Sequence, residues 1–149
     1  MLAIGDPAPD FELPDQDGRL VRLADLLAHG QALVYFYPAD FTPVCTREAC
    51  AFDELRPDLA GTGMSLVGIS PQDSASHKRF HDRYHLGFPL LADTDKRVIH
   101  AYGCIGFLGL GVKRVSYLIG QDQRILAAVD AAFRVGPHLA LARQALKPH

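Results

Sequence analysis

The chain has 149 residues, of which 48% are hydrophobic and 21% charged, and its formal net charge at pH 7 is −2. This length predicts one domain, 1–149, that can bury roughly 70% of the surface of its unfolded chain without a disulfide or a metal to hold it. The mixed charge gives no basic surface for nucleic acid, and no apolar run is long enough to cross a membrane. We therefore expect a small molecule or another protein as the partner.

The first 18 residues show no basic stretch followed by an apolar segment, so we expect a cytoplasmic protein. The three cysteines cannot all pair within one chain. A reducing compartment keeps such residues as thiols unless one of them takes part in redox chemistry.

The amino-terminal half alternates between extended and helical patterns. Residues 11–26 predict a strand, a turn at 15–18, a second strand and a short helix, because Asp-Gly between extended segments is a hairpin signal. The apolar run 31–38 predicts a strand that is buried on both faces and ended by Pro38. Apolar spacing then predicts a helix from Val44 to about Arg56, where Pro57 forces an end or a kink.

The carboxy-terminal half continues the alternation and closes on a hairpin and a helix. The expected elements are a strand at 64–70, a helix from a cap at 73–76 to His85, a strand at 88–93, a short helix at 94–103, a hairpin of 115–120 with 125–130, and a helix at 136–147. This order predicts an α/β protein with a mixed central sheet flanked by helices.

Cys45 and Cys50 lie five residues apart on the helix predicted after Pro38. On a regular helix their Cα atoms are roughly 8 to 9 Å apart, whereas a disulfide needs Cα atoms within about 7 Å. Either the two thiols never pair, or the first helical turn unwinds to let them pair. The same geometry turns Cys50 away from the apolar residues Ala49 and Phe52, onto a face that we expect to be wet.

Cys45 falls in the first turn of that helix, after a loop that contains prolines. Unpaired amides and the positive end of the helix dipole stabilise an anion there, so a thiolate is favoured and a nucleophile would be well placed. From position alone, a small buried residue without reactivity is an equal alternative.

The segment "PADFTPVC" contains Pro38, Thr42 and Cys45, and it resembles the Pro-x-x-x-Thr-x-x-Cys signature of the peroxiredoxins. Its extension "CTREAC" is similar to the bacterioferritin comigratory protein branch, also called peroxiredoxin Q. The opening "GDPAPDFELPDQDG" and the later "GVKRVSYLIG" resemble further segments of the family, so the resemblance spans most of the chain. It implies a thioredoxin-like fold with an amino-terminal β-hairpin extension.

The resemblance implies roles for residues around Cys45, which would be the peroxidatic nucleophile. Thr42 and the amides of the helix start would hold the peroxide oxygens, and Pro38 would shield the thiolate from water. Arg114 would reach the thiolate and the peroxide, although a surface cation on an edge strand is the alternative for this residue. Glu48 would orient the arginine, with an ordinary solvated helix residue as an equal alternative.

The resemblance also implies a reaction in which Cys50 is the resolving thiol. Cys45 would reduce hydrogen peroxide or an alkyl hydroperoxide and become a sulfenic acid, with which Cys50 would condense. A thioredoxin-like reductant would then reduce the disulfide. No metal and no organic cofactor is expected, and we expect a monomer or a weak dimer.

Three histidines, His77, His81 and His85, are spaced by four residues along one predicted helix. Two of them could share a metal ion, but the acidic residue of a zinc-protease motif is missing. We expect a helix face exposed to solvent or to a partner.

Cys104 and the glycine-rich segment after it have two interpretations each. Cys104 is expected to be a packed small residue, with a second role as an alternative partner of the sulfenic acid. Phe107, Leu108 and Leu110 lie between glycines; we expect this loop to fold against the core, with an exposed dimer or reductant contact as the alternative.

Three other functions remain open on the residues alone. A thiol-disulfide oxidoreductase of the same fold would have Cys-x-x-Cys in place of the spacing of Cys45 and Cys50. A non-catalytic redox sensor or binding module would use the same two thiols to change a surface. A structural zinc site of Cys45, Cys50 and a histidine lacks a familiar ligand spacing.

Overall fold

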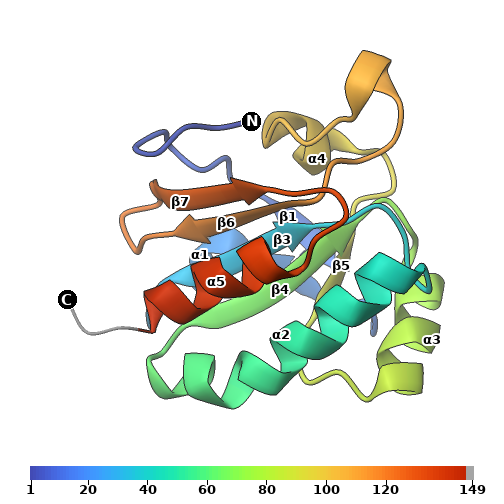
Figure 1. Cartoon of the computed structure of the whole chain (residues 1–149), viewed down its shortest axis with the longest axis horizontal. Helices are drawn as coiled ribbons and strands as arrows, with labels where there is room; N and C mark the ends of the chain where they lie inside the picture. The colour runs from blue at the N-terminus through green and yellow to red at the C-terminus, as the bar shows by residue number, and fades with distance from the viewer. Residues whose placement is uncertain (147–149) are drawn as a thin grey trace.

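The computed structural model describes residues 1–146 and shows two sheets flanked by helices (Figure 1). A two-stranded antiparallel sheet of β1 (Glu12–Pro14) and β2 (Leu20–Arg22) leads into the short helix α1 (Leu23–Leu26). The predicted hairpin and its turn are confirmed. The Gly18 amide donates to the Asp15 carbonyl at 3.0 Å, and Gly18 takes the positive φ of 79° that the turn requires.

The main sheet has five strands in the order β5-β4-β3-β6-β7. Its strands are β3 (Ala32–Phe36), β4 (Ser65–Ser70), β5 (Leu90–Ala92), β6 (Val115–Ile119) and β7 (Ile125–Asp130). The strands β3, β4 and β5 run parallel, whereas β6 pairs antiparallel with β3 and β7 pairs antiparallel with β6. The predicted mixed sheet is thus confirmed, with the fully buried strand β3 at its centre.

The two faces of the sheet carry separate hydrophobic cores because side chains alternate along a strand. Val34 and Phe36 of β3 pack in the core that includes α1 and α4 (Arg97–Ala101). Leu33 and Tyr35 pack in the other core, against α2 (Pro43–Gly61), α3 (Ser74–Tyr84) and α5 (Gly136–Ala145). Figure 1 shows α2 and α5 side by side on this second face.

Helix α2 continues past Pro57 to Gly61, so of the two predicted effects of this proline, an end or a kink, the end near Arg56 is wrong. A proline removes one intrahelical hydrogen bond, but the residues after it can keep helical dihedrals. The extra turn brings Leu59, which is 1% exposed, into the core beneath the helix. Burial of that side chain, about 1.5–3 kcal/mol, offsets the cost of the lost bond.

The remaining helices follow their predicted positions closely. Helix α3 begins as expected after Asp73, whose carboxylate accepts a bond from the Ser76 amide at 2.8 Å. The predicted end of the last helix at 147 lies outside the described residues. Within residues 1–146, no helix combines the length and the apolar character needed to span a membrane.

The segment between α4 and β6 contains a short 3₁₀ helix, η1 (Phe107–Gly109), that was not predicted. Phe107, Leu108 and Leu110 are 83%, 80% and 74% exposed, so the expectation of a loop folded against the core is wrong. Gly109 and Gly111 adopt positive φ angles and turn the chain back on itself. The resulting narrow loop projects its apolar side chains away from the sheet.

Candidate active site

Cys45 is the third residue of α2, in the first turn of the helix that follows the active-site loop, residues 38–42. Thr42 occupies the N-cap position without a side-chain capping bond, and Pro43 follows it. The first intrahelical bond runs from the Thr46 amide to the Thr42 carbonyl at 2.9 Å. The amides of Val44 and Cys45 precede this bond and belong to the electropositive start of the helix. The thiol is 1% exposed, so its surroundings are protein groups more than water.

Arg114 connects this thiol to two other parts of the fold. Its Nη2 donates to Cys45 Sγ at 3.1 Å, its Nη1 to Glu48 Oε1 at 2.7 Å, and its Nε to the Ala132 carbonyl at 2.8 Å. The side chain is 4% exposed and stands immediately before the central strand β6. The guanidinium is therefore held in one orientation by three acceptors, one of which is the sulfur.

Glu48 is fully buried on the inner face of α2, so the alternative of a solvated helix residue is wrong. Burial raises the pKa of its carboxyl to about 7, against the lowering effect of the Arg114 charge and hydrogen bond. Among residues 1–146, Oε1 has its partner in Arg114, while Oε2 has no hydrogen-bond partner. A proton on this carboxyl near neutral pH would relieve the cost of a buried charge.

His138 and Ser116 complete the buried side of the site, and neither was a predicted site residue. Ser116 Oγ and His138 Nδ1 are 2.7 Å apart, and His138 Nε2 lies 2.9 Å from the Ala131 carbonyl. His138 Nδ1 also lies 3.8 Å from Glu48 Oε2. The sequence "GPH" at the start of the last helix gives no indication that His138 belongs to the site, because only the folded chain brings α5 beside α2.

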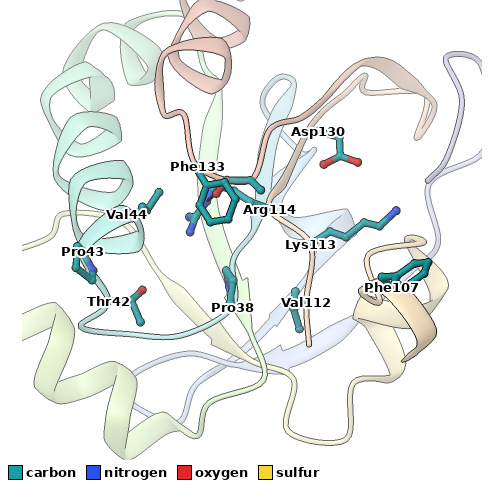
Figure 2. A pocket seen from close by; sticks show the side chains of 11 residues that line it. Pro38, Thr42, Pro43, Val44, Phe107, Val112, Lys113, Arg114, Asp130 and Phe133 are labelled. Atoms are coloured by element: carbon teal, nitrogen blue, oxygen red, sulfur yellow. Dashed lines mark hydrogen bonds between the residues drawn. The ribbon is translucent and has the colours of Figure 1, made fainter. Parts of the chain in front are cut away.

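A pocket of about 620 Å³ opens at Arg114 (Figure 2). Its walls are mainly apolar, formed by residues of the active-site loop, the start of α2, η1 and the segment after β7. These are Pro38, Pro43, Val44, Phe107, Val112, Ala132 and Phe133, with Thr42, Lys113, Arg114 and Asp130 as the polar residues. In Figure 2 the ring of Phe133, which is 81% exposed, stands before Arg114.

Thr42 and Pro38 both line the pocket, as the sequence motif suggested. Thr42 Oγ1 donates to the Ala39 carbonyl at 3.0 Å, which uses its hydrogen and leaves the oxygen able to accept. Pro38 is half-buried between the end of β3 and the pocket. The structure thus places the threonine and the arginine at one opening, and the buried Cys45 contacts that arginine.

The active-site loop is fastened to α3 through Asp40 and His77. His77 Nδ1 lies 2.7 Å from Asp40 Oδ2, and Asp40 also accepts from the hydroxyls of Tyr37 and Ser76 at 2.7 and 2.8 Å. Although burial raises it, the hydrogen bonds from His77 and Tyr37 hold the pKa of Asp40 below its usual value. The expectation of a solvated histidine face is wrong for His77, which is fully buried.

The next loop residue, Phe41, adopts the left-handed backbone conformation with a φ of 66°. This conformation is strained for a residue other than glycine. The ring of Phe41 packs against Phe80 and Tyr84 of α3, with centroids 5.1 and 6.4 Å away. Aromatic packing and the Asp40 bonds together hold the strained turn that leads into α2.

The other two cysteines lie in different surroundings, and all three thiols are free in the described part of the chain. Cys50 is half-buried on α2, and burial, with Asp53 and Glu54 nearby, raises the pKa of its thiol. Cys104 is fully buried in the core on the opposite face of the sheet, where burial raises the pKa of its thiol to about 12. A direct reaction of Cys104 with Cys45 would require the sheet to open.

A zinc site of Cys45, Cys50 and a histidine finds no support in this arrangement. Within residues 1–146, no group of three or more His, Cys, Asp or Glu side chains is placed to hold a metal ion. Both ring nitrogens of the buried His77 already have hydrogen-bond partners, Asp40 at Nδ1 and the Leu91 carbonyl at Nε2.

Comparison with known proteins agrees with this geometry. The AhpC/TSA family profile matches residues 4–128. Peroxiredoxin Bcp of Escherichia coli is 38% identical over 99% of this chain and 97% of its own. A putative peroxiredoxin of Mycobacterium tuberculosis is 41% identical over 85% of this chain and 84% of its own.

Solved structures of the same family superpose closely. The crystal structure of peroxidoxin BcpB from Mycobacterium tuberculosis has a TM-score of 0.91 at 36% identity, covering 98% of this chain and 97% of that chain. A structure from work on the alkyl peroxide reduction activity of the Xanthomonas campestris bacterioferritin comigratory protein has a TM-score of 0.83 at 27% identity, covering 91% and 89%. This chain therefore has the thioredoxin fold, belongs to the peroxiredoxins in their bacterioferritin comigratory protein branch, and is a thiol peroxidase.

Proposed function

We propose that this thiol peroxidase uses Cys45 as its peroxidatic nucleophile and Cys50 as its resolving thiol. The observation that carries the proposal is the position of the Cys45 sulfur, which lies at a helix start, 3.1 Å from Arg114 Nη2, beside an apolar pocket. Positive charge from the guanidinium and the helix start favours the thiolate, which is the reactive form. A peroxide in the pocket would meet Thr42 and Arg114, and Arg114 contacts that sulfur.

In the first step the thiolate attacks one oxygen of the peroxide. The sulfur–oxygen bond forms as the oxygen–oxygen bond breaks, so Cys45 becomes a sulfenic acid while the other oxygen leaves as hydroxide or alkoxide and takes up a proton. Negative charge moves from the sulfur to the leaving oxygen during this step. Arg114 and the amides at the helix start are fixed donors for that charge, and the Thr42 oxygen can accept the hydrogen of the peroxide.

The pocket supports alkyl hydroperoxides as substrates in addition to hydrogen peroxide. Its volume of about 620 Å³ is far larger than hydrogen peroxide requires, and its walls are mainly apolar. Phe133 and Val44 would contact an alkyl group while the hydroperoxide points toward Arg114. Alkyl peroxide reduction is the activity described for the Xanthomonas campestris relative.

Resolution by Cys50 requires the start of α2 to unwind. Residues 45 and 50 both belong to the regular helix, where five residues separate Cα atoms by roughly 8 to 9 Å, beyond the reach of a disulfide. Unwinding would also expose Cys50 and free its thiol from the burial that raises its pKa, which makes it a better nucleophile. A thioredoxin-like protein would then reduce the disulfide by thiol exchange.

Peptide mapping after peroxide treatment tests both roles in one experiment. Arg47 lies between the cysteines, so trypsin separates them, and a Cys45–Cys50 disulfide appears as two joined peptides. We expect this product in the wild type, a stable sulfenic acid in Cys50→Ser, and no peroxide consumption in Cys45→Ser. The Cys104→Ala variant is the matched control and should give the wild-type product. A disulfide to Cys104, or peroxide consumption without Cys45, would contradict the assignment.

A redox sensor that uses the same two thiols differs in turnover. A peroxidase consumes many equivalents of peroxide when a thioredoxin and its reductase are supplied, whereas a sensor stops after one. The same assay with glutathione in place of thioredoxin identifies the class of reductant. A cytoplasmic location and a monomer or weak dimer remain part of the proposal; sedimentation of the reduced and oxidised forms tests the second.

A further inference from the structure

The site contains one buried titratable pair that the reaction described above does not use, Glu48 and His138. Both side chains are fully buried, and they come from different helices, α2 and α5. Glu48 Oε2 has no hydrogen-bond partner among the described residues, and His138 Nδ1 stands 3.8 Å away. An unpartnered carboxylate oxygen in this position is costly, and the imidazole is a group at short distance that can exchange a proton with it.

The hydrogen bonds of His138 identify which ring nitrogen can exchange that proton. The Ala131 carbonyl can only accept, so His138 Nε2, at 2.9 Å, carries a hydrogen in either charge state. Nδ1 is therefore the atom that gains or loses a proton. When it is unprotonated it accepts the hydrogen of the Ser116 hydroxyl at 2.7 Å.

We propose that His138 is a positioning residue that shares one proton with Glu48, and that this proton decides how much of the positive charge of Arg114 acts on the sulfur of Cys45. With the proton present, on Glu48 Oε2 or on His138 Nδ1, the pair has no net charge and does not neutralise the positive charge of Arg114. With the proton released to solvent, the pair carries one negative charge. Glu48 then competes with the thiolate for the guanidinium that both of them touch.

Burial acts in opposite directions on the two ionisable groups of the pair. Burial, followed in effect by the charge of Arg114, lowers the pKa of His138, while the Ala131 bond and the charge of Asp130 on β7 oppose this. Burial raises the pKa of Glu48 to about 7. The two groups lie 3.8 Å apart, so we expect them to titrate as a pair, with a transition that belongs to both residues together.

The proposal rests on the proposed role of Cys45, but its test needs no peroxide. The rate of Cys45 alkylation by iodoacetamide is measured against pH in a Cys50→Ser, Cys104→Ala background. In the parent, we expect a transition near neutrality in addition to the ionisation of the Cys45 thiol itself. In Glu48→Gln this additional transition should disappear.

Two substitutions are expected to shift the pH of this transition in opposite directions. His138→Asn keeps a hydrogen-bonding group at the place of Nδ1 but cannot take up a proton, so the pair loses one of its two proton sites. The transition should move to lower pH, by about 0.3 unit if the two sites hold the proton equally and by more if His138 holds it better. Ser116→Ala removes the hydroxyl that competes for Nδ1, and the transition should move to higher pH. If the transition stayed at the pH of the parent protein in both variants, the proposal would be overturned.

A measurement on the unsubstituted site keeps the test valid if a variant fails to fold. In ¹⁵N-labelled protein the imidazole nitrogens of His138 are followed between about pH 5 and 8, the range in which histidine titrates. We expect the Nδ1 signal to change at the pH of the alkylation transition while Nε2 stays protonated. A constant Nδ1 signal would reject proton sharing. Failure to turn over peroxide, with both titrations present, would count against the proposed function alone.

Discussion

Replacement of Arg114 by methionine removes the positive charge beside Cys45 while keeping most of the buried volume. The guanidinium donates to the sulfur at 3.1 Å, and a hydrogen bond to a charged group contributes about 1.5–3 kcal/mol. If the thiolate and the transition state lose that amount, oxidation of Cys45 by hydrogen peroxide should slow by roughly 10- to 150-fold. The assay is quenched-flow mixing in a Cys50→Ser background, with the sulfenic acid trapped by dimedone and counted by mass spectrometry.

The same substitution also leaves Glu48 buried without its cation, so the loss of stability must be separated from the loss of reactivity. Breaking a buried ion pair on one side costs about 3–5 kcal/mol. The double variant Glu48→Gln, Arg114→Met carries no buried charge at either position, and we expect it to recover much of the stability measured by urea denaturation. Its oxidation should stay slow. Oxidation at the parent rate in this double variant would refute the role given to Arg114.

Three further predictions concern the pocket, the buried carboxyl and the anchored loop. Phe133→Ala should lower kcat/KM for cumene hydroperoxide about tenfold, the effect of losing about 1.4 kcal/mol of apolar contact, and leave hydrogen peroxide turnover unchanged; equal loss for both substrates would contradict the apolar wall. The pKa of Glu48 is about 7 in the fold and 4.5 ordinarily, so the folded state binds this proton more tightly. The contribution of this protonation to the free energy of unfolding, about 3 kcal/mol, should be full below pH 4.5 and lost as the pH rises toward 7. It is measured as the stability difference between wild type and Glu48→Gln across that range. A pH-independent difference would argue against it. Asp40→Asn should destabilise the fold by about 3–5 kcal/mol at neutral pH and by less in acid, because the contribution of a carboxyl with a lowered pKa disappears as the pH falls. The measurement is urea denaturation. Equal stability of wild type and variant at neutral pH would show that the Asp40–His77 pair is not stabilising.

The parts of the fold that could be predicted from the sequence are those whose cause is local. The continuous apolar run of β3 indicates a central strand, and Asp17-Gly18 indicates the turn of the hairpin. The position of Cys45 after Thr42 and Pro43 indicates the helix start, because capping and proline geometry act within a few residues.

Local patterns could not predict the buried polar partners, because their causes lie far away along the chain; the contact of Glu48 with Arg114 was expected from the family resemblance alone. Glu48 meets Arg114 across 66 residues, His77 meets Asp40 across 37, and Ser116 meets His138 across 22. Each of these residues would be expected at the surface from its type alone. The helix beyond Pro57 was missed for a related reason, because only the packed sheet offers a core for Leu59.

The left-handed backbone at Phe41 has a consequence for how long the oxidised enzyme stays exposed to damage. Residues held in such a conformation store on the order of 1–3 kcal/mol, which is released when the loop and the first turn of α2 open. The Asp40 bonds and the packing of the Phe41 ring oppose that opening. If Cys50 resolves Cys45 as proposed, the balance between them would set the lifetime of the sulfenic acid, during which a second peroxide can convert it irreversibly to the sulfinic acid. Asp40 and Phe41 would then determine how the oxidised molecules divide between repair and inactivation.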